Sequence, residues 1–457
     1  MPNKACLLFL AGSIVTGALI LSGCAKISPP PLSDTSKGQW GRLRPIADNN
    51  HPNLYYNQSE IDELRNMILV QHDPQHLSDN YFNHVRGMMA ITTDPNAPVG
   101  SPAEHPHYTN MGAAISYMIE PTSNKADAMR ASLLSFMNAF PNGLPSFYKT
   151  PGCYFCGYSV SWMFDLIMAY HPDKVSSAEK TNLKNWFAKS AERFKFNTRN
   201  PRAVSGSGFD MPATVTREGK TMVSFPNWYS RYMGPSLACA LVSGNQNDVD
   251  YWGDSGWPHD LFTFDGVTGR YPSTAANRYD LVMYLLAVYP SGANTDTYDR
   301  ERYRASESDW YTVDYTWGGY HFAQMDGAIL GAEMAYHNGM TGVFRLTDQD
   351  TEPALLRTFK RAVQSRAEFD RQPANPTGHP IIGWSPELFA GYRRYADPTI
   401  EDAIAGVIEY SDPVSMGRRN GPEIPATVWE FFGYPRRIVW TLRVSALPPS
   451  PRRSVND

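Results

Sequence analysis

The sequence predicts an all-α protein whose helical hairpins form an (α/α) toroid, an incomplete barrel of about six or seven pairs. Three observations lead to this prediction. Apolar residues recur at the spacing of amphipathic helices along most of the chain, whereas alternating strand patterns are rare and short. The helical segments pair through turns, without a heptad pattern or a repeat of fixed period, which leaves a bundle, a solenoid or a ring. Long loops rich in Gly, Pro and Asn favour the ring, where functional residues collect on loops at one mouth.

The chain begins with a segment typical of exported bacterial proteins. Lys4 precedes an apolar run from Leu7 to Leu21, which is short for a membrane-spanning helix. Leu21-Ser22-Gly23-Cys24 resembles a lipobox, so residues 1–23 are predicted to be a lipoprotein signal peptide and Cys24 the lipidated first residue. An uncleaved anchor and a plain secretory signal are the alternatives. The predicted location is the cell envelope, in the periplasm or at the outer membrane, with membrane contact only through the lipid.

The rest of the chain is predicted to be a tether, one domain and a tail. Residues 24–50 contain Pro29-Pro30-Pro31 and few apolar positions, which is typical of a flexible tether. No breakpoint divides the helical region, so residues 51–445 are predicted to form one toroid domain, with a disordered tail over 446–457. The predicted helices are, in chain order, one from Ser59, Met111–Ile119, Lys125–Asn138, Val160–Tyr170, one from a capping box at Ser176 through Phe194, Ser230–Leu241, Arg278–Val288, Gln324–His337, Glu352–Glu368 and Pro398–Ile408.

Composition narrows the class of partner. A hydrophobic content of 42% supports a full core, and a net charge of −4 gives no reason to expect nucleic acid or an anionic membrane surface as partner. Aromatic residues make up 13% of the chain, with 26 Tyr and 11 Trp, and their flat amphipathic rings suit sugars as well as cores. Motifs typical of phosphate binding, of serine hydrolases and of zinc peptidases are missing from the sequence, which therefore predicts no cofactor.

The cysteines predict a small structural disulfide. Cys6 lies in the leader, Cys24 is the lipid site, and Cys239 sits in an apolar stretch. Cys153 and Cys156 form a Cys-x-x-Cys in a loop, where a redox motif, half a zinc site or a local disulfide are possible. A second pair that would complete a zinc site is missing from the sequence, and no βαβ pattern surrounds the motif, so the disulfide is favoured.

Several stretches, in the same order along the chain, resemble the alginate-lyase family of (α/α)-toroid polysaccharide lyases. His51-Pro52-Asn53-Leu54 is similar to the family's segment before the first helix, and Val160–Leu166 to its helix with an aromatic-Asp-Leu signature. Trp384–Leu388 and Tyr392-Arg393-Arg394-Tyr395, followed by Pro398, resemble its closing segment. The resemblance implies a monomeric toroid enzyme that cleaves an acidic, uronate-containing polysaccharide by β-elimination.

Two further stretches carry the chemistry that the resemblance implies. Tyr320-His321-Phe322-Ala323, before a helix that ends at Asn338-Gly339, resembles the family's Tyr-His-x-Tyr-Ala run, which contains its catalytic tyrosine. Asn227-Trp228-Tyr229-Ser230-Arg231-Tyr232 stands where the family has Asn-Asn-His-x-Tyr-Trp, so that Tyr229 replaces its histidine and Trp228 its neutralising asparagine. The family has an Asp-Gly, followed by an arginine, shortly before its catalytic tyrosine. Here about fifty residues, with a predicted extra helix, separate Asp265-Gly266 from Tyr320. These departures imply a relative of alginate lyases, one whose polymer is alginate or a β-1,4-linked glucuronate such as glucuronan or cellouronate.

The chemistry of β-elimination explains why these residue types matter. Removing the C5 proton of a uronate creates an enolate-like dianion, which Asn, Arg or His donors must stabilise, and a base and an acid are also needed. We predict Tyr320 as base and acid, although its ordinary pKa of about 10 must then fall. The other predicted catalytic residues, each of which has a structural alternative as a cap, a packing residue or a salt-bridge partner, are His321, Asn227, Tyr229, Arg231 and Arg278.

Four residues are predicted to contact the sugar. His107 and Tyr108 follow His105 in a loop predicted to lie at the mouth, where metal binding is disfavoured because partner ligands are missing from the surrounding sequence. Trp317 is a candidate stacking platform, as is Trp162, although its apolar helical face favours a core position.

Two other classes of function remain open. A glycoside hydrolase of the same architecture needs two carboxylates on either side of the bond, and no motif pairs Asp265, Asp314, Asp326 or Glu387. A non-catalytic glycan-binding lipoprotein would use the aromatic residues alone.

Overall fold

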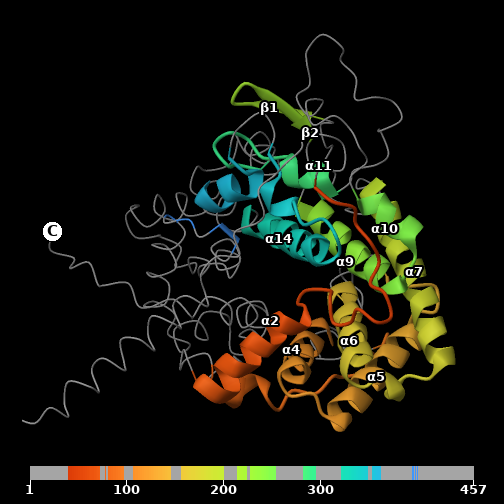
Figure 1. Ribbon diagram of the computed structural model, residues 1–457. Coiled ribbons are helices and arrows are strands. Elements are labelled where there is room, and N and C mark those ends of the chain that lie inside the picture. The colour runs from red at the N-terminus through yellow and green to blue at the C-terminus, as the bar shows by residue number, and fades with distance from the viewer. Residues whose placement is uncertain are drawn as a thin grey trace, which may run out of the picture.

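The structure is a computed structural model that describes residues 40–72, 78, 81–96, 106–145, 156–199, 214–223, 227–253, 281–294, 321–347, 352–361, 394–395, 397 and 399. Helices dominate these ranges, which confirms the all-α class for the described part of the chain (Figure 1). The α-helices are α2 (Gln58–Arg65), α4 (Pro106–Ile119), α5 (Ser123–Ala139), α6 (Cys156–Tyr170), α7 (Ser177–Arg199), α9 (Asn227–Ser243), α10 (Gln246–Trp252), α11 (Leu281–Leu286) and α14 (His321–His337). Residues 354–361 are also helical.

Three long helices run side by side in the same direction. A Cβ on Gly157 of α6 would lie 2.7 Å from the Cβ of Pro235 on α9, and one turn further Ser161 contacts Cys239. Helix α14 packs on the other side of α9, because a Cβ on Gly331 would lie 3.2 Å from Cε of Met233. The carboxyl-terminal ends of α9 and α14 meet the same segment, because the Arg44 and Ile46 N–H groups donate to the carbonyls of Asn338 and Leu241. The amino-terminal ends of α6, α9 and α14 therefore lie at one end of the described helices.

Two neighbouring helices complete this arrangement. Tyr117, near the end of α4, bonds through its hydroxyl to Nδ1 of His171 just after α6 at 2.7 Å, so the carboxyl-terminal ends of these packed helices meet. Helix α7 runs opposite to α9, since Ser236 bonds to the Ala191 carbonyl while Gly244 lies near Lys184. Helices α6 and α9 thus run in one direction and α7 in the opposite one, as consecutive helices of helical hairpins do.

The residues before α2 are part of this packing. The backbone N–H groups of Arg44 and Ile46 donate to the carbonyls of Asn338 and Leu241, at the ends of α14 and α9. Trp40, Leu43 and Ile46 are buried. Residues 40–50, expected to belong to the tether, therefore pack on the helices, whereas residues 1–39 lie outside the described chain.

Several helices begin earlier than their apolar periodicity indicates. Helix α2 has Asn57 as its N-cap, in a capping box with Glu60, rather than a start at Ser59. Helices α4, α9 and α14 start about three to five residues before the predicted positions, because polar and aromatic residues form their first turns. The predicted capping box between Ser176 and Glu179 at the start of α7 is confirmed.

One hairpin of two strands was not predicted. Strands β1 (Thr214–Arg217) and β2 (Lys220–Val223) pair antiparallel across Glu218 and Gly219, both of which have positive φ. A two-residue turn of this kind matches the twist of a hairpin, and glycine tolerates it. In Figure 1 the hairpin lies at the top of the view, away from α2, α4 and α5.

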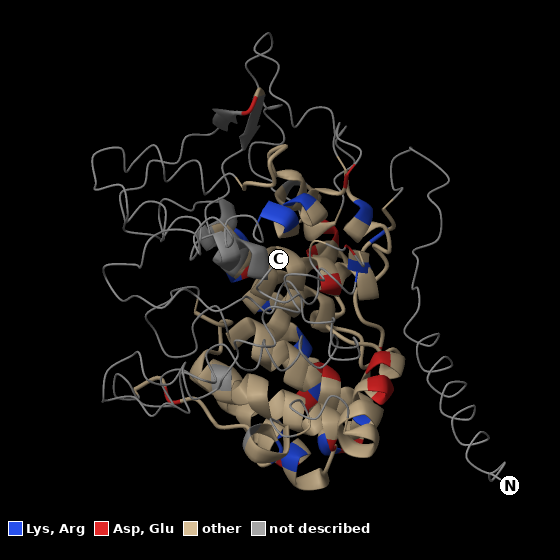
Figure 2. Cartoon of the chain, turned by 90° about the vertical axis from the view of Figure 1, so that its left-hand side faces the viewer, with Lys and Arg blue, Asp and Glu red and all other residues tan. Residues whose placement is uncertain are grey.

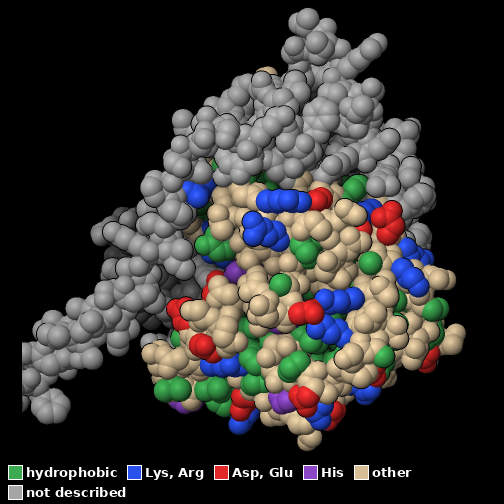
Figure 3. Space-filling model, turned by 45° about the vertical axis from the view of Figure 1, so that its right-hand side comes forward, with side chains coloured by type: hydrophobic (Ala, Val, Ile, Leu, Met, Phe, Trp, Pro, Cys, Tyr) green, Lys and Arg blue, Asp and Glu red, His purple; other side chains and the backbone are tan. Residues whose placement is uncertain are grey.

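The core is aromatic and the surface is mixed. Trp40, Trp162, Trp186 and Trp252 are among the largest fully buried side chains. Figure 2 shows basic and acidic residues interspersed over the described helices, and in Figure 3 hydrophobic side chains lie scattered between charged ones on the visible face. Within the described ranges, no helix combines the length and the apolar character that crossing a membrane requires.

Candidate functional site

The predicted catalytic residues that the structure describes lie in the first turns of α9 and α14. Asn227 is the first residue of α9 rather than its N-cap, and Arg231 follows one turn later. His321 is the first residue of α14. The described structure gives the backbone of these three residues and not their side chains. The other predicted residues that lie outside the described chain are Tyr320, Arg278, Trp317 and Cys24.

Tyr229 is described in full and is buried. Its side chain is 2% exposed, and its ring lies 5.3 Å from the ring of Tyr284 on α11, with an angle of 38° between the planes. Tyr284 is 3% exposed. Position 229 therefore faces protein, on the side of α9 that meets α11.

The predicted sugar-contacting residues have different surroundings. His107 is buried in the first turn of α4, and Tyr108 beside it is described only by its backbone. Trp162 is 1% exposed and packs between Tyr55 and Tyr56, with ring centroids 5.3 and 6.1 Å away. This packing leaves no face of the indole for a sugar ring, and it agrees with the core alternative for Trp162.

At the other end of the helices, Asp165 joins the segment before α2 to α6. Its carboxylate accepts hydrogen bonds from the backbone N–H groups of Asn53 and Leu54, each at 3.0 Å, and lies 2.6 Å from Nδ1 of His51. An ionised carboxylate only accepts, so His51 donates through Nδ1. The Nε2 atom of His51 is buried and has no partner in the described structure. Three donors hold Asp165 in a fully buried position, where a free carboxylate would be costly.

Asn53 and Asn338 join the same segment to the end of α14. The Asn53 amide donates to the His337 carbonyl at 2.7 Å and to Oδ1 of Asn338 at 3.2 Å. In return Asn338 donates to the Asn53 carbonyl at 2.9 Å and to the Met334 carbonyl at 2.8 Å. The two amides therefore clamp backbone segments that are 285 residues apart.

Four charged or titratable side chains lie next to these amides. Nε2 of His337 lies 2.8 Å from Oε2 of Glu60, and Nδ1 lies 2.9 Å from the Glu333 carbonyl. Arg394 binds both carboxylate oxygens of Glu333 and lies 4.0 Å from Glu60. The guanidinium also covers the ring of Tyr336, 4.1 Å from its centroid. We call His51, Asn53, Glu60, Asp165, Glu333, His337, Asn338 and Arg394 the polar cluster.

The hydrogen bonds fix where a proton lies in the polar cluster. The Glu333 carbonyl accepts only, so Nδ1 of His337 carries a hydrogen. Nε2 faces a carboxylate oxygen of Glu60 that also accepts from the Asn57 N–H. Burial alone would lower the pKa of Arg394, but Glu333 and then Glu60 outweigh it and raise that pKa. The buried Arg394 guanidinium is thus paired with the buried carboxylate of Glu333.

The polar cluster is built for holding segments together. Its members come from the segment before α2, from α2, α6 and α14, and from the region of residue 394. Within the described residues, no group of three His, Cys, Asp or Glu side chains is arranged to hold a metal ion. Sequence reasoning assigned no role to Glu60, Glu333 or His337. For Glu333 the sequence does contain a signal, because it is the single glutamate in the apolar run from Ala328 to Ala335. A charge buried in such a run requires a partner.

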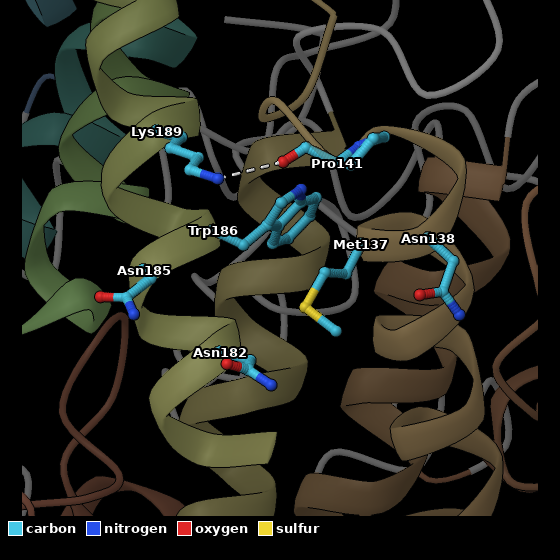
Figure 4. A pocket seen from close by; sticks show the side chains of 7 residues that line it. All are labelled: Met137, Asn138, Pro141, Asn182, Asn185, Trp186 and Lys189. Atoms are coloured by element: carbon cyan, nitrogen blue, oxygen red, sulfur yellow. Dashed lines mark hydrogen bonds between the residues drawn. The ribbon is translucent and has the colours of Figure 1, made fainter. Parts of the chain in front are cut away.

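A groove lies between α5 and α7, beside the part of α7 that runs from Asn182 to Lys189. Figure 4 shows Asn182 and Lys189 of α7 on the side of Met137 and Asn138 of α5, whereas the Asn185 side chain points away from them. Trp186 lies between the two helices, and its indole N–H donates to the Phe140 carbonyl at 2.8 Å. The indole N–H is therefore already bonded within the protein, and the asparagine side chains are exposed as on any helix surface. We assign no function to the groove.

Two of the five cysteines lie in the described residues, and Cys156, expected in a loop, is the first residue of α6. Cys156 is buried at the start of α6, whereas Cys153 lies outside the described residues, so their disulfide stays a prediction. Cys239 is buried between α9 and α6, and burial raises the pKa of its thiol to about 12. At neutral pH this thiol is protonated and behaves as a core residue.

A comparison of the sequence with models of known protein families finds no match, and neither does a comparison with curated protein sequences.

Proposed function

We propose that the protein is an exported, lipid-anchored polysaccharide lyase that cleaves a 1,4-linked uronate polymer, glucuronan or alginate, by β-elimination. In this proposal the described helices belong to an (α/α) toroid. The main support is the polar cluster. His51 and Asn53, Asp165, Asn338 and Arg394 come from four separate stretches that resemble alginate lyases, and they meet in one hydrogen-bonded assembly. Independent chance resemblances would have no reason to converge in space.

The direction of the helices supports an anionic substrate. The amino-terminal ends of α9 and α14 lie at the same end of the described helices, and the first N–H groups of a helix have no partner within the helix and carry partial positive charge. Such ends favour carboxylates. Asn227 and Arg231 stand in the first turns of α9, and His321, which follows Tyr320 in the sequence, is the first residue of α14.

The proposed reaction proceeds by transfer of one proton and cleavage of one bond. Tyr320, as phenolate, removes the C5 proton while Asn227, Arg231 and His321 or Arg278 stabilise the negative charge on the uronate carboxylate. The C4–O4 bond then breaks, a C4=C5 double bond forms, and O4 leaves as a hydroxyl after receiving a proton from the tyrosine. The chain's own residues supply the base, the acid and the charge stabilisation.

The product tests the proposal directly. Purified protein is incubated with glucuronan, with alginate and with glycosaminoglycans, and the ultraviolet absorbance of the unsaturated uronate is followed together with reducing ends. A lyase gives both signals in equal amounts. Reducing ends without the chromophore would identify a hydrolase, and polymer binding without either signal a glycan-binding protein.

The Tyr320→Phe variant tests the catalytic assignment. Loss of a general acid–base group costs about 10²–10⁴-fold in rate, while binding of the polymer should persist. Turnover is measured at saturating polymer, and binding by affinity electrophoresis. Turnover equal to that of the unsubstituted protein would remove Tyr320 from the mechanism.

A further inference from the structure

We propose that Tyr229 is a positioning residue that, with Tyr284, fixes the first turns of α9, and that it does not itself touch the substrate. The inference rests on the proposed function and revises the expectation that Tyr229 acts as a second acid or base. A group that exchanges protons with a substrate must reach it. Tyr229 and Tyr284 are 2% and 3% exposed, and their rings cover one another at 5.3 Å.

Helix geometry separates Tyr229 from the residues proposed to bind the carboxylate. Positions 227 and 231 are four residues apart and share one face of α9. Position 229 is two residues from each, about 200° around the helix, and therefore lies on the opposite face. Position 233 shares the face of 229, and Met233 indeed meets α14 at Gly331. Positions 227 and 231 instead share a face with Pro235, which packs on Gly157 of α6, so they lie on the α6 side of the helix and not on the α11 side.

The start of α9 is held on both sides by close contacts. On one side a Cβ at Gly331 of α14 would lie 3.0 Å from Cδ1 of Leu281 and 3.2 Å from Cε of Met233, so α9, α11 and α14 meet at this glycine. On the other side a Cβ at Gly234 would overlap the hydroxyl of Tyr158 on α6. The Tyr229–Tyr284 ring pair adds an aromatic contact to these two. Loss of the pair would allow the first turns of α9 to rotate.

The test compares three substitutions, two at position 229 and one at position 284. Tyr229→Phe keeps the ring and removes the hydroxyl, whereas Tyr229→Leu and Tyr284→Leu remove a ring of the pair. We expect Tyr229→Phe to keep kcat within a few-fold and both Leu variants to lose on the order of 10²-fold, because small displacements of catalytic groups are costly. KM and the thermal midpoint are measured for each variant.

Phe187→Leu is the matched control. Phe187 is buried in α7, and its ring also lies 5.3 Å from a partner, Phe164, on the half of the fold away from the start of α9. This variant should lose thermal stability like the two Leu variants and keep kcat. Equal kcat in all three Leu variants would overturn the positioning role, and a loss in Tyr229→Phe as large as that in Tyr320→Phe would make Tyr229 a catalytic residue.

A measurement without substrate separates this inference from the proposed function. Native protein is treated with tetranitromethane, and nitration of Tyr229 is read by mass spectrometry of its peptide. We expect Tyr229 to stay unmodified in the unsubstituted protein and to react in Tyr284→Leu. Nitration of Tyr229 in the native protein would refute its burial against Tyr284, whether or not any polymer is cleaved. Absence of cleavage with a protected Tyr229 would instead count against the lyase.

Discussion

The two ends of the parallel helices are built from different interactions. At the carboxyl-terminal ends, the polar cluster joins residues from 51 to 394 through charged and amide hydrogen bonds. At the amino-terminal ends, aromatic rings and glycines make the contacts, as in the Tyr229–Tyr284 pair and in the approach of Gly234 to Tyr158. The first kind of contact is directional, and the second depends on shape.

The two kinds of contact contribute to the fold in different ways. Buried charged and amide groups tolerate only partners that satisfy them, so the polar cluster determines which segments come together. Packing through rings and glycines depends on complementary shape and places no charged side chain of the described residues in the contact. In the proposed lyase, one end closes the assembly and the other binds the polymer.

Removing the Asp165 carboxylate should have the largest effect. Asp165→Ala leaves the His51 ring and the N–H groups of Asn53 and Leu54 without their acceptor in a buried place. Breaking a buried hydrogen-bonded pair costs about 3–5 kcal/mol. The measurement is the free energy of unfolding from urea denaturation at neutral pH.

Two variants show whether the lost acceptor is the cause. Asp165→Asn has the same shape, so a large cost there as well excludes the cavity as the main source. Asp127→Ala removes an exposed carboxylate that pairs with Lys174 at 2.9 Å, and such pairs contribute about 0.2–1 kcal/mol. An Asp165→Ala cost no larger than that of Asp127→Ala would mean that the polar cluster does not specify the fold.

The helices could be predicted from the sequence because each depends on local spacing. Leu183, Trp186 and Phe194 recur at helical intervals and are all buried on α7. The partners of Asp165 could not be found in this way, since they lie more than a hundred residues away and a single aspartate in an apolar helix does not name them. The resemblance to alginate lyases indicated these stretches but not their contacts.

The candidate site could be predicted only in part. Asn227, Arg231 and His321 were expected near a helix start, and their backbones do begin α9 and α14. The face of Tyr229 was available from the sequence, because two residues along a helix reach the opposite side, but the start of α9 was expected three residues too late. The α11 contact that buries Tyr229 is a tertiary feature that no local pattern contains.

A methyl group at Gly234 should have an intermediate effect at the amino-terminal ends. In Gly234→Ala the new Cβ would overlap the Tyr158 hydroxyl, and both residues are held between α6 and α9. Overpacking of this kind costs about 1–3 kcal/mol. Gly87→Ala is the control, because a Cβ there meets nothing within 4 Å. If both variants unfold at the same urea concentration, shape does not hold these ends as the comparison requires.

The smallest effect should come from an exposed ion pair beside the polar cluster. Asp48, in the segment before α2, pairs with Lys180 at 2.9 Å and Lys184 at 2.6 Å, and hydrogen bonds from Lys180 and then Lys184 lower the pKa of Asp48 to about 2. An unfolded aspartate has a pKa near 3.9. The pairs therefore stabilise the fold above about pH 4, and the contribution disappears as the pH falls towards 2.

Asp48→Asn should accordingly cost about 0.2–1 kcal/mol at pH 7, because exposed pairs are weak, and nothing below pH 2. The same cost should shrink in high salt, which screens exposed charges, whereas the cost of Asp165→Ala should not, because Asp165 is buried. Unfolding of both variants is followed at low and high salt. If the cost of Asp48→Asn did not change with salt, the Asp48 pairs would behave like the buried Asp165 contacts. The difference between the surface and the interior at this end would then be wrong.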